Sequence, residues 1–153
     1  MRREDSMAQK KAIVRNISRM TFAGKSDSNH WVTMDASEES GGYGAATSPM
    51  ELLLIALGGC TGSDVVSILR KKRVPFREFE IHISAERAEI HPKVYTKIQI
   101  EYIVAGDSTV QQDVERAIEL SVSKYCSVSA MLGKTAVISH TASIVGEIEG
   151  STV

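Results

Sequence analysis

Residues 48–66 read SPMELLLIALGGCTGSDVV, and the rest of the fold is organised around this stretch. Ser48 and Pro49 are typical of a helix start, because serine caps free N–H groups and proline loses no hydrogen bond in the first turn. Glu51 follows three residues after Ser48, which is the spacing of a reciprocal capping box. The next residues are almost wholly apolar, so we expect a helix that is buried over most of its surface.

Three glycines surround Cys60 within this predicted helix, at positions 58, 59 and 62. Each glycine costs about 1 kcal/mol of helix propensity relative to alanine, so their clustering requires a physical reason. One reason is close packing of the helix backbone against a neighbouring element. The other is that a reactant must reach the sulfur of Cys60. Composition alone does not choose between these two explanations.

The composition is that of a globular protein. The chain has 153 residues, of which 42% are apolar and 24% are charged. A net charge of -1 gives no general attraction to nucleic acid or to anionic membranes, so we expect neither as a partner. The longest apolar run, residues 52–60, is too short to span a bilayer, and no signal-peptide pattern follows the charged N-terminus. These features predict a cytoplasmic protein.

Hydrophobic periodicity predicts an α+β fold of mainly antiparallel strands in the order ββ-α-ββ-α-β. We expect residues 1–11 to be a disordered leader and residues 12–153 to form one domain. The central helix is predicted over residues 49–72, and a second helix over residues 109–125 is followed by a short helical piece at 127–132. The predicted strands are residues 12–22, 30–36, 79–85, 94–104 and 136–147, with loops at 23–29 and 37–47.

Two cysteines, Cys60 and Cys126, are the candidate reactive groups. A free cysteine is most often a small buried hydrophobe, but two cysteines with Cα atoms within about 7 Å can cycle between dithiol and disulfide. Cys126 is expected at the start of the 127–132 piece, where it would gain more from a helix dipole than Cys60 gains in mid-helix. In a cytoplasmic protein both remain reduced unless they are catalytic or redox-sensing.

The sequence shows no recognisable metal or cofactor motif. Its histidines lack the short spacing of zinc ligands, and only His30, which follows a predicted turn, is a candidate for a functional role. Gly41, Gly42 and Gly44 lack the ending of a phosphate-binding loop, and no nucleophile-elbow motif is present. We therefore expect no metal and no cofactor. The remaining histidines are His82, His91 and His140.

Three motifs together resemble the OsmC/Ohr superfamily of osmotically induced and organic-hydroperoxide-resistance proteins. They are SPME at residues 48–51, GGC ending at Cys60, and KYCSV at residues 124–128. The resemblance extends over about residues 12–148 and is closest to the less characterised OsmC-like branch. It implies an α+β fold in which two central helices pack against mainly antiparallel sheets, and an intertwined homodimer with its active sites at the interface.

The resemblance also implies two-cysteine reduction of organic hydroperoxides. Cys60 would be the peroxidatic cysteine that becomes a sulfenic acid, and Cys126 would be the resolving cysteine that forms the disulfide. An external dithiol reductant would then restore both thiols. In peroxidases of the family, a glutamate directly after the helix-opening proline holds an arginine over the thiolate. That position is Met50 here, and Arg19 lies near the place where one branch has the arginine.

Two departures from the family pattern leave alternatives open. Glu51 lies one residue beyond the family's glutamate, about 100° around the helix, so we interpret it as a cap. Without a fixed cation the thiolate is less stabilised, and the oxidant need not be a hydroperoxide. The alternative function is a non-catalytic, stress-related dimer in which Cys60 lines an apolar pocket for a small or lipid-like ligand. A third reading is a structural dimer whose cysteines simply pack.

Overall fold

The computed structural model describes residues 9–150 and divides into two compact units, residues 1–53 and residues 54–153. The boundary falls within the first turns of α1 (Pro49–Lys71), the helix predicted over residues 49–72. Most of the predicted leader, residues 1–8, lies outside the described residues. The prediction of a single domain over residues 12–153 stays a prediction.

The N-terminal unit contains a three-stranded antiparallel sheet. Its strands are β1 (Ala12–Ser18), β2 (Thr21–Ser26) and β3 (Trp31–Met34), in the order β1-β2-β3. All seven residues of β1 are exposed.

The predicted strand over residues 12–22 is wrong, because the chain reverses direction within it. Arg19 adopts a left-handed conformation with φ of 46°, and the side chain of Asn16 donates a hydrogen bond of 2.7 Å to its carbonyl oxygen. The chain therefore turns at residues 19 and 20, and Ala23–Ser26, predicted as part of a loop, belongs to β2. Arg19 lies in this turn and not in a strand.

The loop before α1 is held by the buried carboxylate of Asp35, which is 2% exposed. Its oxygens accept hydrogen bonds from the backbone N–H groups of Ala36, Tyr43 and Ala45 at 2.8, 3.0 and 3.2 Å. Burial acts to raise the pKa of Asp35, but these hydrogen bonds outweigh it and lower the pKa. The loop includes one short helical turn, η1 (Glu38–Ser40), and is more ordered than its glycine content predicts.

The predicted capping box at the start of α1 is confirmed. The N–H of Ser48 donates to Oε2 of Glu51 at 2.7 Å, and the N–H of Glu51 donates to Oγ of Ser48 at 3.3 Å. These bonds lower the pKa of Glu51, the one from the Ser48 backbone most of all. Glu51 is thus occupied in starting the helix.

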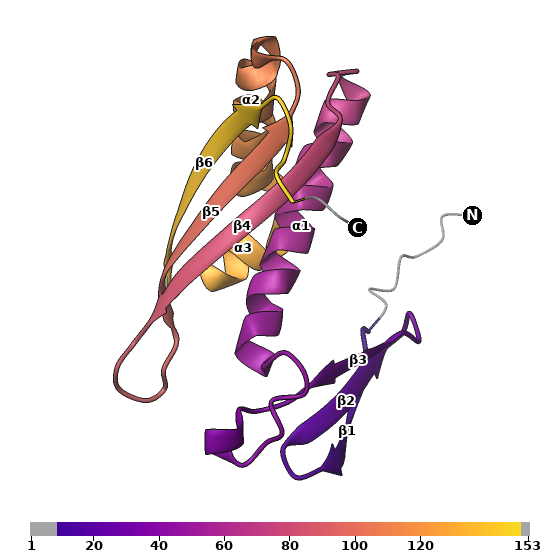
Figure 1. Ribbon diagram of the computed structural model, residues 1–153, viewed down its shortest axis with the longest axis vertical. Helices are drawn as coiled ribbons and strands as arrows, with labels where there is room; N and C mark the ends of the chain where they lie inside the picture. Colours follow the sequence, from indigo (N-terminus) through magenta and orange to yellow (C-terminus); the bar gives the residue numbers. More distant parts are fainter. Residues whose placement is uncertain (1–8, 151–153) are drawn as a thin grey trace, which may run out of the picture. The chain divides into compact units, whose positions relative to one another are not determined.

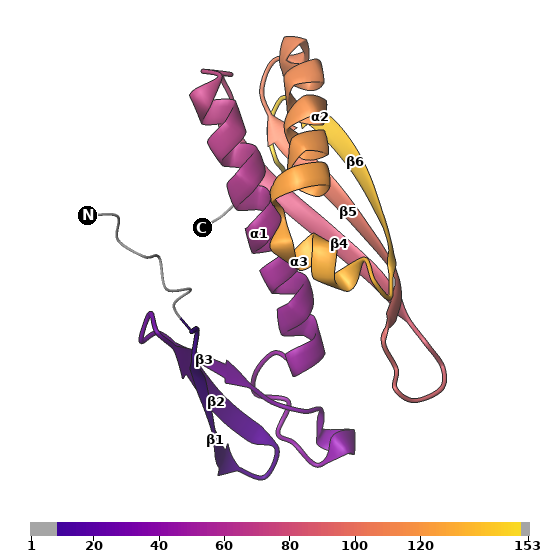
Figure 2. The same cartoon turned by 180° about the vertical axis from the view of Figure 1, so that it is seen from behind.

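The C-terminal unit is a three-stranded sheet with its helices on one face (Figures 1 and 2). The order is β4-β5-β6, with β4 (Glu78–Arg87) antiparallel to β5 (Tyr95–Ala105) and β6 (Val137–Val145) parallel to β5. The two sheets are thus mostly antiparallel, as predicted. The crossover from β5 to β6 consists of η2 (Ser108–Val110), α2 (Gln111–Leu120), the π-helical turn η3 (Ser121–Tyr125) and α3 (Ser127–Leu132).

Strict alternation along the strands turns one apolar face of this sheet toward the helices. Ile81 lies opposite Tyr102 and Ile83 lies opposite Ile100. The predicted alternation of β4 and β5 is present. The core therefore lies between the apolar face of the sheet and the inner surfaces of α1 and α2. Its most buried apolar side chains are Leu57, Val65, Leu69, Ile98, Ile100, Tyr102, Val104, Val114 and Ala117.

The glycines around Cys60 have different roles. A Cβ atom on Gly58 would lie 3.1 Å from Cδ1 of Ile83, and one on Gly62 would lie 3.0 Å from Cδ1 of Ile81. A Cβ atom on Gly59 would meet nothing within 4 Å. Close packing of α1 on β4 therefore accounts for Gly58 and Gly62, whereas nothing in this unit requires a glycine at position 59.

By length and mean hydropathy, 23 residues and 1.9, α1 is a candidate membrane span. The sequence-based exclusion of a membrane span rests on the apolar run at residues 52–60 alone, whereas the whole helix is longer than this run. The helix nevertheless has the structure of a core helix, because its inner residues pack on a sheet and Thr61 and Asp64 make polar contacts in its middle.

We expect Gly59→Ala to raise the free energy of unfolding by about 1 kcal/mol, because alanine is the better helix former and its methyl group meets open space. Gly62→Ala should be less stable than Gly59→Ala, because its methyl group displaces the Ile81 side chain. Urea denaturation of both variants measures the difference, and equal stabilities would contradict the packing role of Gly62.

Candidate active site

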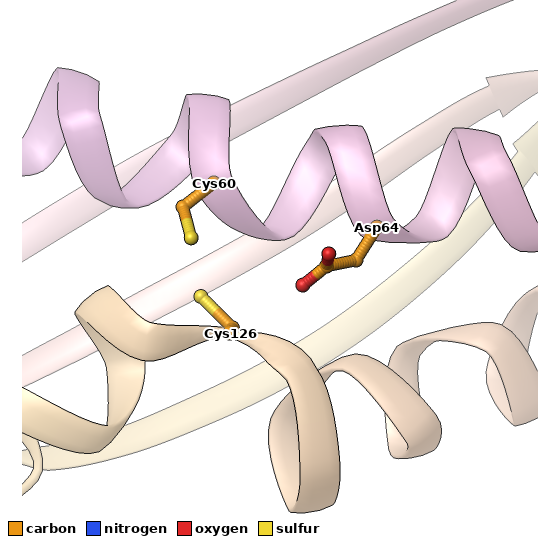
Figure 3. Close-up of side chains that lie close together, drawn as sticks. All are labelled: Cys60, Asp64 and Cys126. Atoms are coloured by element: carbon orange, nitrogen blue, oxygen red, sulfur yellow. The ribbon is translucent and has the colours of Figure 1, made fainter. Parts of the chain in front are cut away.

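Cys60 and Cys126 lie face to face between α1 and the segment that joins η3 to α3 (Figure 3). Their sulfur atoms and a carboxylate oxygen of Asp64 all lie within 4.8 Å of one another. Both thiols are free. The structure thus brings together the two cysteines that the sequence predicted as reactive.

The π-helical turn and the cap of α3 position Cys126. The N–H of Cys126 donates to the carbonyl oxygen of Ser121 at 2.8 Å and closes the turn η3. Cys126 is the N-cap of α3, as predicted, and its sulfur accepts a hydrogen bond from the N–H of Ser129 at 3.4 Å. Single π-helical turns frequently mark functional sites, because the extra residue redirects the side chains that follow.

Burial dominates the chemistry of Cys126, which is only 3% exposed. Burial raises the pKa of the Cys126 thiol, the hydrogen bonds from Ser129 lower it, and the nearby Cys60 thiol raises it, so that the net pKa is raised. The predicted gain from the helix start is thus outweighed by desolvation. Cys60 is half-buried and is the more accessible of the two sulfurs.

Asp64 is the residue at this site that sequence reasoning missed. It lies one helical turn after Cys60, so both side chains are on the same face of α1. Its Oδ2 accepts a hydrogen bond of 3.0 Å from Oγ of Ser121. The four-residue spacing between Cys60 and Asp64 was the available signal.

A chain of buried polar groups extends from Asp64 into the core. Ser121 Oγ lies 3.0 Å from Thr61 Oγ1, which lies 2.6 Å from the hydroxyl of Tyr102. That hydroxyl lies 3.3 Å from Nδ1 of His140, and the two rings are stacked. Burial raises the pKa of Tyr102 to about 12 and lowers the pKa of His140, so both are neutral at pH 7. His140 is a strand residue, as predicted, but it faces the core.

Two hollows are lined in part by residues of α1. A cavity of about 340 Å³ is lined by Asp64, Ser67, Ile68, Lys71, Lys72, Leu120 and Tyr125. An apolar groove of about 370 Å³ is lined by Leu54, Ile55, Gly58, Gly59, Ile81 and Ile83. The first gives solvent and small polar molecules a route to Asp64, and the second suits an apolar group.

The remaining predicted residues lie in the N-terminal unit. The Arg19 guanidinium is stacked over the ring of Tyr43 at 4.8 Å from its centre. Met50 is in the first turn of α1, where the family's glutamate would be, and His30 is an exposed residue just before β3. The role of Arg19 beside Cys60 stays a prediction.

The sulfurs of Cys60 and Cys126 and a carboxylate oxygen of Asp64 are close enough together to hold a metal ion, and zinc would require both cysteines as thiolates. None of the four histidines belongs to this set, so their spacing was the wrong place to look for a metal. The predicted absence of a metal stays a prediction.

Comparison with known proteins supports the resemblance in the motifs. Residues 41–141 match the protein family described as OsmC-like protein. Protein YhfA of Escherichia coli (strain K12) is 42% identical over 134 residues, which cover 88% of this chain and 97% of that protein. The crystal structure of a hypothetical protein from Aquifex aeolicus VF5 is 34% identical, covers 91% of this chain and 99% of that chain, and has a TM-score of 0.74.

More distant structures share the fold. An organic hydroperoxide resistance protein OsmC from Legionella pneumophila is 13% identical, with a TM-score of 0.69 over 91% of this chain and 99% of that chain. At this identity the likeness concerns the fold alone.

Iodoacetamide should alkylate Cys60 well before Cys126 in the folded protein at pH 7, because only a thiolate reacts and burial keeps Cys126 protonated. Peptide mapping of a time course measures both rates, and in guanidinium chloride they should become equal. Faster labelling of Cys126 would contradict this order, and two unreactive thiols would indicate cysteines that only pack.

Proposed function

The chain belongs to the OsmC-like protein family, and we propose that it is a thiol-dependent redox protein that reduces organic hydroperoxides or related oxidants through a Cys60–Cys126 disulfide cycle. The Legionella pneumophila protein that shares the fold is described as an organic hydroperoxide resistance protein and a predicted redox protein, which agrees with this proposal. The observation that carries the proposal is the approach of two free thiols from α1 and from the start of α3.

The cycle balances in three steps. The Cys60 thiolate attacks the terminal peroxide oxygen, the O–O bond breaks, and the alkoxide takes a proton to leave as an alcohol. The resulting sulfenic acid condenses with the Cys126 thiol, which gives the disulfide and one water. An external dithiol then reduces the disulfide by two exchange reactions and is itself oxidised. Cys60 acts first on this account because it is the more exposed sulfur.

The substrate side of the site differs from that of the family's peroxidases. Met50 replaces the glutamate that would hold an arginine, and we propose Arg19 as the cation that stabilises the thiolate and the leaving alkoxide. Arg19 is preorganised by stacking on Tyr43. If it fulfils this role, the reaction lacks the usual carboxylate support, and we expect a slower peroxide reduction than a complete Arg–Glu pair gives.

A second candidate function rests on the apolar groove beside Gly58 and Gly59. A non-catalytic protein would hold a small or lipid-like ligand there, and Cys60, the residue after Gly59, would have no redox role. Native mass spectrometry distinguishes the two functions, because a copurified ligand retained in Cys60→Ser supports binding without catalysis.

We further propose a homodimer, in keeping with the family resemblance. The sheet of the N-terminal unit leaves Ile13, Val14 and Ile17 more than half exposed. Ile13 and Ile17 lie on one face of β1 and Val14 on the other, and exposed apolar side chains of this kind are typical of a surface that another chain covers. Light scattering should give the mass of two chains, and a monomer at micromolar concentration would contradict the dimer.

We also propose a cytoplasmic location, where a thiol reductant is present.

Mixing reduced protein with cumene hydroperoxide should produce an intramolecular Cys60–Cys126 disulfide, seen as the loss of two hydrogens in the intact mass. Cys126→Ser should stop at the Cys60 sulfenic acid, which dimedone traps, and Cys60→Ser should consume no peroxide. The buffer contains a chelator, so that no metal ion occupies the two sulfurs during the assay. Metal analysis of the purified protein shows whether Cys60, Asp64 and Cys126 hold zinc.

Hydrogen peroxide serves as the second oxidant in the same assay. Arg19→Ala should slow the first step, whereas Arg15→Ala, on the neighbouring strand, should not. If neither oxidant forms the disulfide faster than it oxidises free thiols in solution, the peroxidase proposal fails.

A further inference from the structure

We propose that Asp64 is the general base that takes the proton from Cys126 when the disulfide closes, an inference that rests on the proposed redox cycle. The carboxylate oxygen lies within 4.8 Å of both sulfurs, a span that one bridging water or a small rotation covers. Figure 3 shows the carboxylate pointing from α1 into the space in front of Cys126.

The chemistry requires such a base. Cys126 is only 3% exposed, so bulk water does not reach its sulfur to take the thiol proton, and a thiol that keeps its proton is a poor nucleophile. As this sulfur attacks the Cys60 sulfenic acid, its proton passes to Asp64. The S–O bond of Cys60 breaks, the departing hydroxide takes the proton from Asp64, and one water leaves. Asp64 is ionised again at the end of the step.

The buried polar chain holds the side chain of Asp64 in place. A hydroxyl group has one proton to donate, and Ser121 donates its proton to Asp64. Thr61 must then donate to Ser121, and Tyr102 must donate to Thr61. Every hydrogen bond in the chain therefore points toward the carboxylate, which stabilises its negative charge and holds its orientation.

His140 sets the far end of the chain. Because Tyr102 donates to Thr61, its oxygen accepts from His140, which places the imidazole proton on Nδ1. Nε2 of His140 is buried and has no hydrogen-bond partner among residues 9–150, as expected for the nitrogen without a proton. Burial lowers the pKa of His140 and keeps the ring neutral, so the direction of the chain holds at pH 7.

Other ionisable groups lie around Asp64, but none of them is proposed as the base. Lys71 and Lys72 line the same cavity, and Lys72 is paired with Asp113 at 2.5 Å. The groups that face Asp64 are Cys60, Lys71 and Lys72 from α1, Tyr125 and Cys126 from η3 and its end, Tyr102 from β5 and, through Tyr102, His140 from β6.

The test isolates disulfide closure from peroxide reduction. Reduced protein is treated with 5,5'-dithiobis(2-nitrobenzoate), which forms a mixed disulfide at the accessible Cys60 and releases one coloured thiolate. Attack by Cys126 then releases a second thiolate, and mass spectrometry confirms that the product is the internal disulfide. The proton of Cys126 passes to Asp64 in this step as well, so the result does not depend on the peroxidase activity.

Asp64→Asn should slow closure by about 10²- to 10⁴-fold at pH 7, and the closure rate is measured from the mixed disulfide so that the rate of Cys60 labelling does not enter it. The closure rate of Asp64→Asn should rise about tenfold per pH unit, because hydroxide replaces the base, whereas the wild-type rate should vary less. The asparagine oxygen still accepts from Ser121, so we expect the variant to fold. Asp64→Glu should recover part of the rate, and Asp27→Asn, at an exposed position after β2, is the surface control.

Closure that is not slowed in Asp64→Asn would contradict the role of Asp64 as a base. A carboxylate that only repels a neighbouring thiolate would make Asp64→Asn close as fast as the wild type or faster, and this overturns the proposal. Tyr102→Phe keeps the carboxylate but interrupts the chain that orients it, so closure should be slower than in the wild type. An unchanged closure rate in Tyr102→Phe would contradict the role of the chain.

Discussion

The close approach of α1 to β4 is the constraint on which the rest of the structure depends. Gly58 and Gly62 let the helix lie against Ile83 and Ile81, at a distance that larger residues would not allow. At this depth Thr61 reaches the hydroxyl of Tyr102 at 2.6 Å. The same placement turns Cys60 and Asp64 toward Cys126, so the glycines that weaken the helix also position its chemistry.

Local signals made much of the fold predictable. Ser48, Pro49 and Glu51 marked the start of α1, and the alternation in β4 and β5 gave the inner face of the sheet. The turn at Arg19 was not predictable, because it lacks glycine, proline or another strong turn residue at its centre. The parallel pairing of β6 was not specified either, since it depends on how the crossover from β5 returns to the sheet.

The site was only half predictable, because local signals identify single residues but not contacts between distant elements. The family motifs identified Cys60 and Cys126, and helical spacing could have added Asp64. The chain from Ser121 through Tyr102 to His140 joins η3, β5 and β6, and no local pattern connects these elements. Helical periodicity also did not reveal the π-helical turn that sets the direction of Ser121 and Cys126.

Met50 stands at the start of α1, where the resemblance to the family's peroxidases implies a glutamate, and the carboxylate that lies near the thiols is that of Asp64, one turn after Cys60. A redox titration tests the central claim most directly. Protein equilibrated in buffers of reduced and oxidised dithiothreitol is alkylated, and its intact mass is measured by mass spectrometry. The account predicts one two-electron transition in which Cys60 and Cys126 lose their reactivity together. Two thiols that stay alkylatable in the most oxidising buffer would contradict it.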